Sequence, residues 1–288
     1  MPDKKKTFSI CSAIRQGVCL SAVCILAAGR AHGQVQQSEA YKQVERRYQN
    51  LGTVAEAIQK VKQGSFYGPH VEEIAEAGAV EAIPALKEQF AHSVDASHKD
   101  DLDPGNKEEI ASALVRLGEK DDIYWDFLVK QATEAVDSDA PFPREFDSKG
   151  KMLDDHFSPA FLQWAKQHSL SPGDAGEMVV YRFPGKLLML AETGDPRGIP
   201  LLRRAMSSPN YMIQVMAAKG LAKLQDKDSI PLIIAACGNS PWAAPAIAQA
   251  LIYFDDPQAQ STAEKYLPKQ MFEALREARQ TPGNDPFR

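Results

Sequence analysis

A unit of about 30 residues recurs in the second half of this chain, and this repetition limits the possible folds more than any other feature. Three segments align as LAETGDPRGIP (190–200), LAKLQDKDSIP (221–231) and LIYFDDPQAQ (251–260). Their aspartates, Asp195, Asp226 and Asp256, are 31 and then 30 residues apart. A tandem unit of this length predicts stacked supersecondary elements, each covering the apolar face of its neighbour.

Each unit has the pattern of two antiparallel helices. Ser208-Pro209 and Ser240-Pro241 are predicted helix starts. The serine side chain can cap the first turn, and proline at the first helical position loses no hydrogen bond. Asp195 before Pro196 is predicted to have the same role. The second helix of one unit carries an apolar stripe with small members that let neighbouring helices approach closely: Ile213, Met216, Ala217, Gly220, Leu221 and Leu224. Alternating β-branched runs are nearly absent, so the sequence predicts an all-α solenoid.

Weaker copies lie upstream, over 75–90 and 114–128. The 76 residues between Gly118 and Gly194 leave room for a degenerate repeat and an insertion rich in Asp, Ser and Pro. We therefore expect about five helix pairs and one long inserted loop. The expected divisions are a helical N-terminal extension (34–69), degenerate repeats (70–136), the insertion (137–159), and further repeats with a C-terminal cap (160–288).

The segment LAETGDPRGIPLLRRAM, followed by SPNYMIQVMAAKGLAKL, resembles a HEAT repeat of the short kind that also occurs in phycobilisome lyases. The resemblance is good over 188–257 and weaker over 70–136. It implies a right-handed helical stack used mostly to bind proteins, in which helices after the Asp-Pro turn line the concave side. The sequence departs from the family's repeat pattern at two places. The first copy has Ala79 in place of the aspartate, and the last copy has Gln260-Ser261 in place of Ile-Pro. Polar deviation in a terminal copy suits an end cap.

The first 33 residues have the pattern of a secretory signal peptide. A basic start at Lys4, Lys5 and Lys6 precedes an uncharged run over 17–29 and a small-x-small site at Ala31-His32-Gly33. We expect cleavage after Gly33 and a periplasmic or secreted product. Without this segment, which has five basic residues and one acidic one, 28 basic and 37 acidic residues leave a formal net charge of −9. That balance argues against general nucleic-acid binding and against docking on anionic lipid.

Catalytic motifs are missing from the sequence. It has no zinc-protease helix, nucleophile elbow or phosphate-binding glycine loop. Cys237, the only cysteine after residue 33, extends an apolar helix face and is predicted to be buried. We therefore predict no catalytic residue, no metal site and no cofactor, and a non-catalytic protein-binding or scaffolding module of the cell envelope. The alternatives are a pigment-lyase-like enzyme or a chaperone on the same repeats, or a self-associating structural component.

Two groups of residues are candidates for partner binding. Arg197, Arg203 and Arg204 form a basic group that would steer an acidic protein or peptide, unless they pair with acids such as Asp226. Phe142 and Phe146 lie in the insertion and either pin it onto the solenoid or make it a binding loop. We expect a monomer that does not insert in a membrane once the signal is removed.

Overall fold

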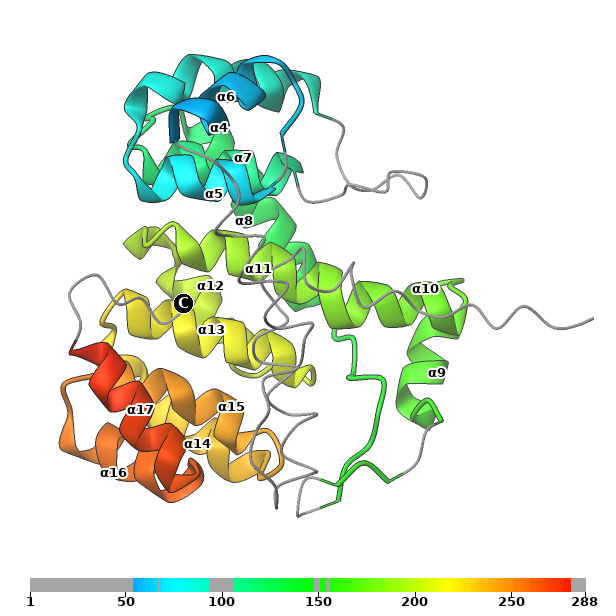
Figure 1. Cartoon of the computed structure of the whole chain (residues 1–288). Helices are drawn as coiled ribbons and strands as arrows, with labels where there is room; N and C mark the ends of the chain where they lie inside the picture. Colours follow the sequence, from blue (N-terminus) through cyan, green and yellow to red (C-terminus); the bar gives the residue numbers. More distant parts are fainter. Residues whose placement is uncertain (1–53, 67, 94–105, 148–150, 154–155, 281–288) are drawn as a thin grey trace, which may run out of the picture.

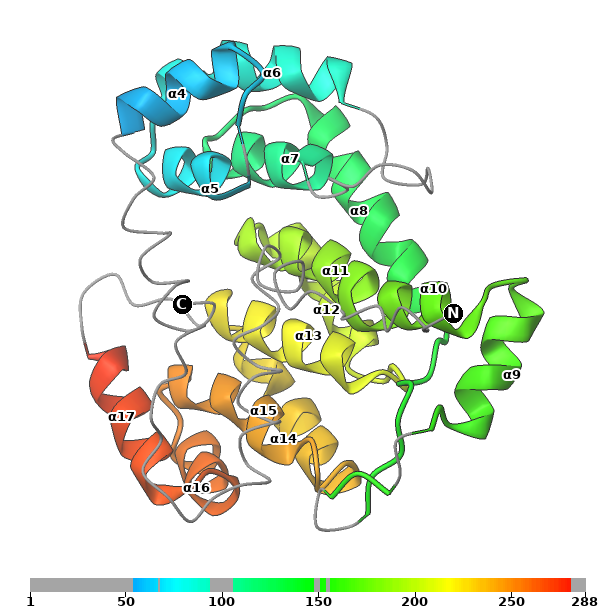
Figure 2. The same ribbon diagram turned by 45° about the vertical axis from the view of Figure 1, so that its right-hand side comes forward.

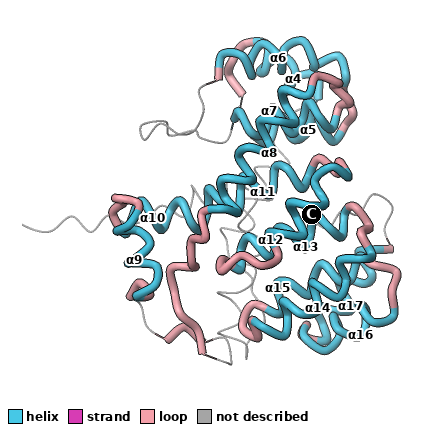
Figure 3. Tube along the Cα trace, turned by 180° about the vertical axis from the view of Figure 1, so that it is seen from behind, coloured by secondary structure: helices cyan, strands magenta, loops and turns pink. Residues whose placement is uncertain are grey.

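The computed structural model describes residues 54–66, 68–93, 106–147, 151–153 and 156–280. Over these residues it contains helices and loops, and its only strand-like feature is one isolated bridge between Phe146 and Met152 (Figure 3). The predicted all-α class and α-solenoid are confirmed. No helix in this part of the chain is long and apolar enough to cross a membrane. The predicted signal peptide, 1–33, lies outside the described residues.

The helices are arranged in two rows. The first row contains α4 (Val54–Lys62), α6 (Ile83–His92), α8 (Asp122–Asp137), α12 (Ile199–Ala205), α14 (Ile230–Asn239) and α16 (Pro257–Tyr266). The second row contains α5 (Gly68–Glu76), α7 (Asn106–Arg116), α11 (Phe183–Glu192), α13 (Tyr211–Lys223), α15 (Ala244–Ala248) with the 3₁₀-helix η5 (Gln249–Tyr253), and α17 (Lys269–Arg279). Each second-row helix packs against the first-row helix that it is paired with, and the pairs stack from α4 at one end to α17 at the other (Figure 1).

The described residues therefore hold six helix pairs, where the sequence predicted about five. The additional pair consists of α4, from the predicted N-terminal extension, and α5. Helix α5 begins at Gly68, two residues before the expected start of the repeats.

Four of the five turns that lead from the second row back to the first share one backbone geometry; the turn between η5 and α16 does not. A residue with positive φ follows the second-row helix. The residue five positions after it is an isoleucine, which is the first or second residue of the next first-row helix. This residue is glycine at three turns, where φ is 63° (Gly78), 82° (Gly118) and 67° (Gly194), and it is Gln225 with φ 52° at the fourth. Glycine takes this left-handed region without steric cost, which explains its recurrence.

The predicted cap at Asp195 is confirmed, and the two aspartates in register with it differ from each other. The carboxylate of Asp195 accepts from the Arg197 amide before the 3₁₀-helix η3 (Pro196–Gly198), and Asp256 accepts from the Ala259 amide. Asp226 makes no cap before the 3₁₀-helix η4 (Lys227–Ser229), because its carboxylate binds other groups.

The two Ser-Pro helix starts are also displaced. The hydroxyl of Ser208 accepts from the Asn210 amide inside a turn, so α13 begins only at Tyr211, with Asn210 as its cap. Helix α15 begins four residues after Ser240, because the backbone turns once more before it. The extra turn in each place reverses the chain direction between the paired helices.

Helix α13 lies at the centre of the solenoid core, between α11, α12 and the pair α15–η5. Ile213, Ala217 and Leu221 are fully buried on its predicted stripe. A Cβ atom on Gly220 would lie 2.7 Å from the Cβ of Ala191 and 3.0 Å from a methyl group of Leu202. The small residue therefore sets how closely α13 approaches its neighbours, as the sequence predicted.

The insertion is longer than predicted and lies in a different place relative to the repeats. Helix α8 pairs directly with α11, so everything between them, residues 138–182, is inserted within one helix pair. The interval between Gly118 and Gly194 thus contains a repeat, the pair α8–α11, and an insertion, as predicted. Helices α9 (Pro159–Gln167) and α10 (Pro172–Glu177), which the predicted divisions placed largely among the repeats of 160–288, belong to the insertion: they pack on each other and lie to the side of both rows (Figure 1).

A π-helix, η2 (Met178–Arg182), connects α10 to α11. In the i to i+5 pairing of a π-helix, the partner of the Val179 carbonyl is position 184, and Pro184 has no amide hydrogen to donate. The buried Asn210 side chain donates to that carbonyl instead, at 2.7 Å. Asn210 thus caps α13 and also ties the end of the insertion to the next helix pair.

Candidate functional site

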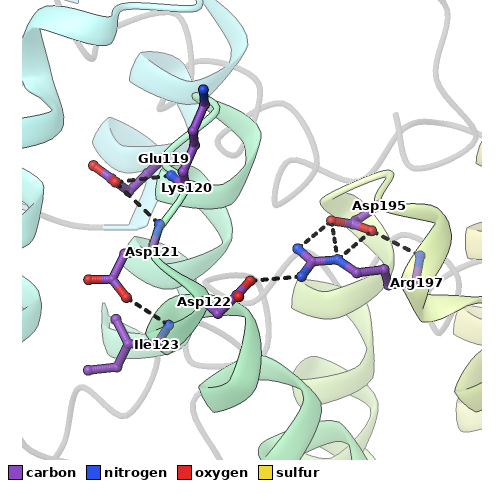
Figure 4. Close-up of polar contacts among 7 residues, drawn as sticks. All are labelled: Glu119, Lys120, Asp121, Asp122, Ile123, Asp195 and Arg197. Atoms are coloured by element: carbon purple, nitrogen blue, oxygen red, sulfur yellow. Dashed lines mark hydrogen bonds and ion pairs between the residues drawn. The ribbon is translucent and has the colours of Figure 1, made fainter.

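Arg197 lies at the turn between α11 and α12, where its guanidinium contacts two carboxylates (Figure 4). Its Nε and Nη2 donate to Asp195 at 3.0 and 2.8 Å, and its Nη1 donates to Asp122, at the start of α8, at 2.9 Å. The guanidinium carbon lies 4.4 Å from the ring centroid of Trp125. The hydrogen bond from Arg197 lowers the pKa of Asp195. Arg197 therefore bridges two successive first-row helices.

Arg203 makes a second bridge of the same kind. Its Nε donates to Asp226 Oδ2 at 2.8 Å and its Nη2 donates to Asp226 Oδ1 at 2.6 Å, and the Ser229 hydroxyl also donates to this carboxylate. Burial raises the pKa of Asp226, but the hydrogen bonds from Arg203 and Ser229 outweigh burial and leave the pKa below its usual value. The side chain of Asp226 is only 8% exposed, so this bidentate pair is partly shielded from water.

Arg204 completes the group through an ion pair of 2.9 Å with Asp137, at the end of α8. Counting Asp228 at 3.5 Å from Arg203, five carboxylates lie within 4 Å of the three guanidinium groups. The formal charge of the group is thus negative. This geometry favours the alternative that the arginines pair with neighbouring acids, and their contact with a partner stays a prediction.

Phe142 and Phe146 lie on the strap, which we define as residues 138–147 at the start of the insertion. The Phe142 ring packs edge-to-face on Tyr211, with centroids 4.5 Å apart. The Phe146 ring is stacked on Trp242, at 4.2 Å and an interplanar angle of 13°. Tyr211 and Trp242 also contact each other edge-to-face at 4.4 Å. The two phenylalanines therefore attach the strap across two consecutive helix pairs.

The described hydrogen bonds of the strap backbone connect it to the rest of the insertion and not to these helix pairs. The Trp164 indole donates to the Ser138 carbonyl at 2.9 Å, the Ser158 amide donates to the Pro143 carbonyl at 2.9 Å, and the Leu153 amide donates to the Glu145 carbonyl at 3.0 Å. The described contacts of the strap with α13 and with the turn before α15 are the ring contacts of Phe142 and Phe146, and Ala140 and Pro143 of the strap are also buried.

Two residues that hold the strap were not among the candidates predicted from the sequence. Trp242 is half-buried and stacks on Phe146. Tyr211 was not singled out, and it is 95% covered at the start of α13. The signal that identifies Trp242 is its place in the Ser-Pro-Trp turn, outside a helix.

The chemistry available in the described part of the chain is limited. No group of three or more His, Cys, Asp or Glu side chains there could hold a metal ion. Cys237 is fully buried, its thiol lies 3.8 Å from the Ala244 carbonyl, and burial raises its pKa to about 12. A thiol in this state is a poor nucleophile at neutral pH.

Comparison with protein families identified one match: residues 187–252 match the family model of HEAT repeats. The matched span runs from within α11 to within η5 and contains the pairs α12–α13 and α14–α15. Neither the curated proteins nor the solved structures gave a match.

Proposed function

We propose that this HEAT-repeat protein is a non-catalytic protein-binding or scaffolding module that is exported to the cell envelope or the extracellular space. The match to HEAT repeats and the helical stack support a protein that binds or organises protein partners. The export part of the proposal depends on the signal pattern of residues 1–33.

The observation that carries the proposal is the stack itself. Its pairs share one continuous core, and ion pairs such as Arg197–Asp122 and Arg203–Asp226 join successive pairs. A solenoid of this kind presents an extended surface that many side chains contribute to, which suits a large protein partner better than a small molecule.

The proposal is tested by immobilising the chain that starts at Gln34 and capturing proteins from an envelope extract of the source cells. A recovered protein is then purified and titrated against the chain by calorimetry. We expect saturable binding at a fixed stoichiometry. Arg204→Glu tests the predicted arginine group, because Arg204 is half exposed and makes a single described ion pair, and Lys130→Glu on α8 is the matched charge reversal outside that group.

Three outcomes would contradict the proposal. If no captured protein binds saturably, the scaffold function is wrong. If a tetrapyrrole added to the mixture becomes covalently attached to the recovered protein, a pigment-lyase-like enzyme is the better description. If the full chain expressed in bacteria stays in the cytoplasm with residue Met1 retained, the export part is wrong.

A further inference from the structure

Tyr211 and Trp242 lie at the N-terminal ends of α13 and α15, on two consecutive HEAT pairs. Both rings face the strap, which runs beside α13 toward α14 and α15 (Figure 2). Their edge-to-face contact makes one aromatic surface that both pairs contribute to. This surface is covered in the structure by Phe142 and Phe146, two residues of the chain that are four positions apart.

The contacts of the strap resemble those of a bound peptide more than those of a repeat. Its backbone is non-helical after Ser138 and bends at Pro143 and Arg144, which brings the Phe142 and Phe146 rings within 6.0 Å of each other, whereas each repeat is helical. Phe142 and Phe146 stay half-buried even when packed, while the core residues of α13 are fully buried. The described hydrogen bonds of the strap backbone stay within the insertion, and its described contacts with Tyr211 and Trp242 are made by aromatic side chains. Side-chain anchors on an aromatic surface are a common mode of peptide recognition.

We propose that Tyr211 and Trp242 form a docking site for a non-helical peptide segment with two aromatic residues four positions apart, and that the strap occupies this site in cis. The inference rests on the proposed protein-binding function and names the chemistry of one partner segment. A tethered ligand competes at an effective concentration of about millimolar, so an external segment binds weakly until the strap is displaced. The strap is therefore an autoinhibitory contact.

The test uses a synthetic, fluorescently labelled peptide with the sequence of residues 139–147, DAPFPREFD, and measures its binding by anisotropy. The full chain and its Phe142→Ala/Phe146→Ala variant are compared. We expect the variant, which no longer fills the site, to bind the peptide at least tenfold more tightly than the unmodified chain. Adding Trp242→Ala to the variant should abolish this binding. A peptide with alanine at both phenylalanine positions is the matched control and should not bind.

The double variant must first show unchanged helix content and one cooperative melting transition. If it does, and it binds the peptide no more tightly than the unmodified chain, the proposal is overturned. It is also overturned if Trp242→Ala leaves the affinity unchanged. If the double variant does not fold, Phe146→Ala alone replaces it, with a smaller expected gain of about threefold, because Phe142 still covers Tyr211. Envelope partners that are still captured by Trp242→Ala would leave the scaffold function intact while removing this site from it.

Discussion

The HEAT pairs α12–α13 and α14–α15 and the strap that crosses them are attached to the molecule in opposite ways. Helix α13 of these pairs packs on its neighbours through fully buried small and aliphatic residues, such as Ala217, Gly220 and Leu221. The strap contacts them through half-buried aromatic rings, and its described backbone hydrogen bonds lie within the insertion. The comparison indicates that the pairs unfold as one cooperative unit, whereas the strap can detach locally at much lower cost.

Leu221→Ala should have the largest effect, because it truncates a side chain that is 0% exposed near the C-terminal end of α13, the helix at the centre of the core. We expect a loss of about 2–5 kcal/mol in the free energy of unfolding, from lost burial and from the cavity that remains. Chemical denaturation followed by circular dichroism measures this loss. The matched control is Leu224→Ala on the same stripe, which is half-buried and should cost less than half as much. Equal losses for the two variants would show that α13 is not the centre of the core.

Gly220→Ala should have the next largest effect, through overpacking instead of a cavity. The added methyl group would lie 2.7 Å from the Ala191 Cβ, so α11 and α13 must separate. We expect a loss of about 1–3 kcal/mol, again from denaturation curves. Gly238→Ala on α14 is the control, because its methyl group would meet no atom within 4 Å and should stabilise the helix by about 0.4–1 kcal/mol. If both glycine variants change stability in the same direction, the close approach of α11 and α13 is not the reason for a glycine at position 220.

The regular region was more predictable from the sequence than the insertion, for a physical reason. The stripe of α13, the turn glycines and the caps at Asp195 and Asp256 all depend on residues within a few positions of each other. Periodicity and turn preferences report these local effects directly. The copies also reinforce each other, since the same local pattern recurs at fixed spacing.

The insertion depends on contacts between residues far apart in the chain. Nothing near Phe146 in the sequence indicates that it stacks on Trp242, and nothing near Val179 indicates Asn210, 31 residues later. The partners of the arginine group illustrate the same limit. The sequence suggested Asp226 as a partner, but it did not indicate Asp122 and Asp137, which approach from α8.

Asp226→Asn should give a smaller effect, and one that depends on pH. The pKa of Asp226 is lower in the folded chain than its ordinary value of about 3.9, so its carboxylate stabilises the fold above that value and the contribution is lost as the pH falls through the folded pKa. The stability difference between the unmodified chain and Asp226→Asn should be constant above about pH 5 and shrink below about pH 4.

Melting temperatures measured from pH 3 to pH 7 check this dependence. Asp228→Asn is the control, because that side chain is 89% exposed and lies 3.5 Å from the same guanidinium. A pH-independent difference for Asp226→Asn would mean that the ion pair with Arg203 does not join the two helix pairs in solution.

Phe146→Ala should have the smallest effect on global stability, and it tests the strap side of the comparison. The variant loses the stacked contact with Trp242, an interaction worth about 0.5–1.5 kcal/mol beyond area burial. Because the strap opens locally, this loss should raise the population of the open strap by about 2–12-fold while the melting temperature of the solenoid changes little. Limited digestion with trypsin, which cleaves after Arg144 and Lys151, reports the open population as the rate of cleavage in the insertion.

The contrast with Leu221→Ala separates the two kinds of attachment. Leu221→Ala should lower the midpoint of global unfolding and increase cleavage throughout the chain, because all buried sites become accessible together. Phe146→Ala should increase cleavage within the insertion alone. Phe157→Ala is a matched control in the same insertion, because its described ring contacts are with Phe161 and Arg144 and not with the HEAT pairs. If Phe146→Ala instead lowers global stability as much as Leu221→Ala does, the strap is part of the cooperative core, and its release to admit another peptide would require the solenoid to unfold.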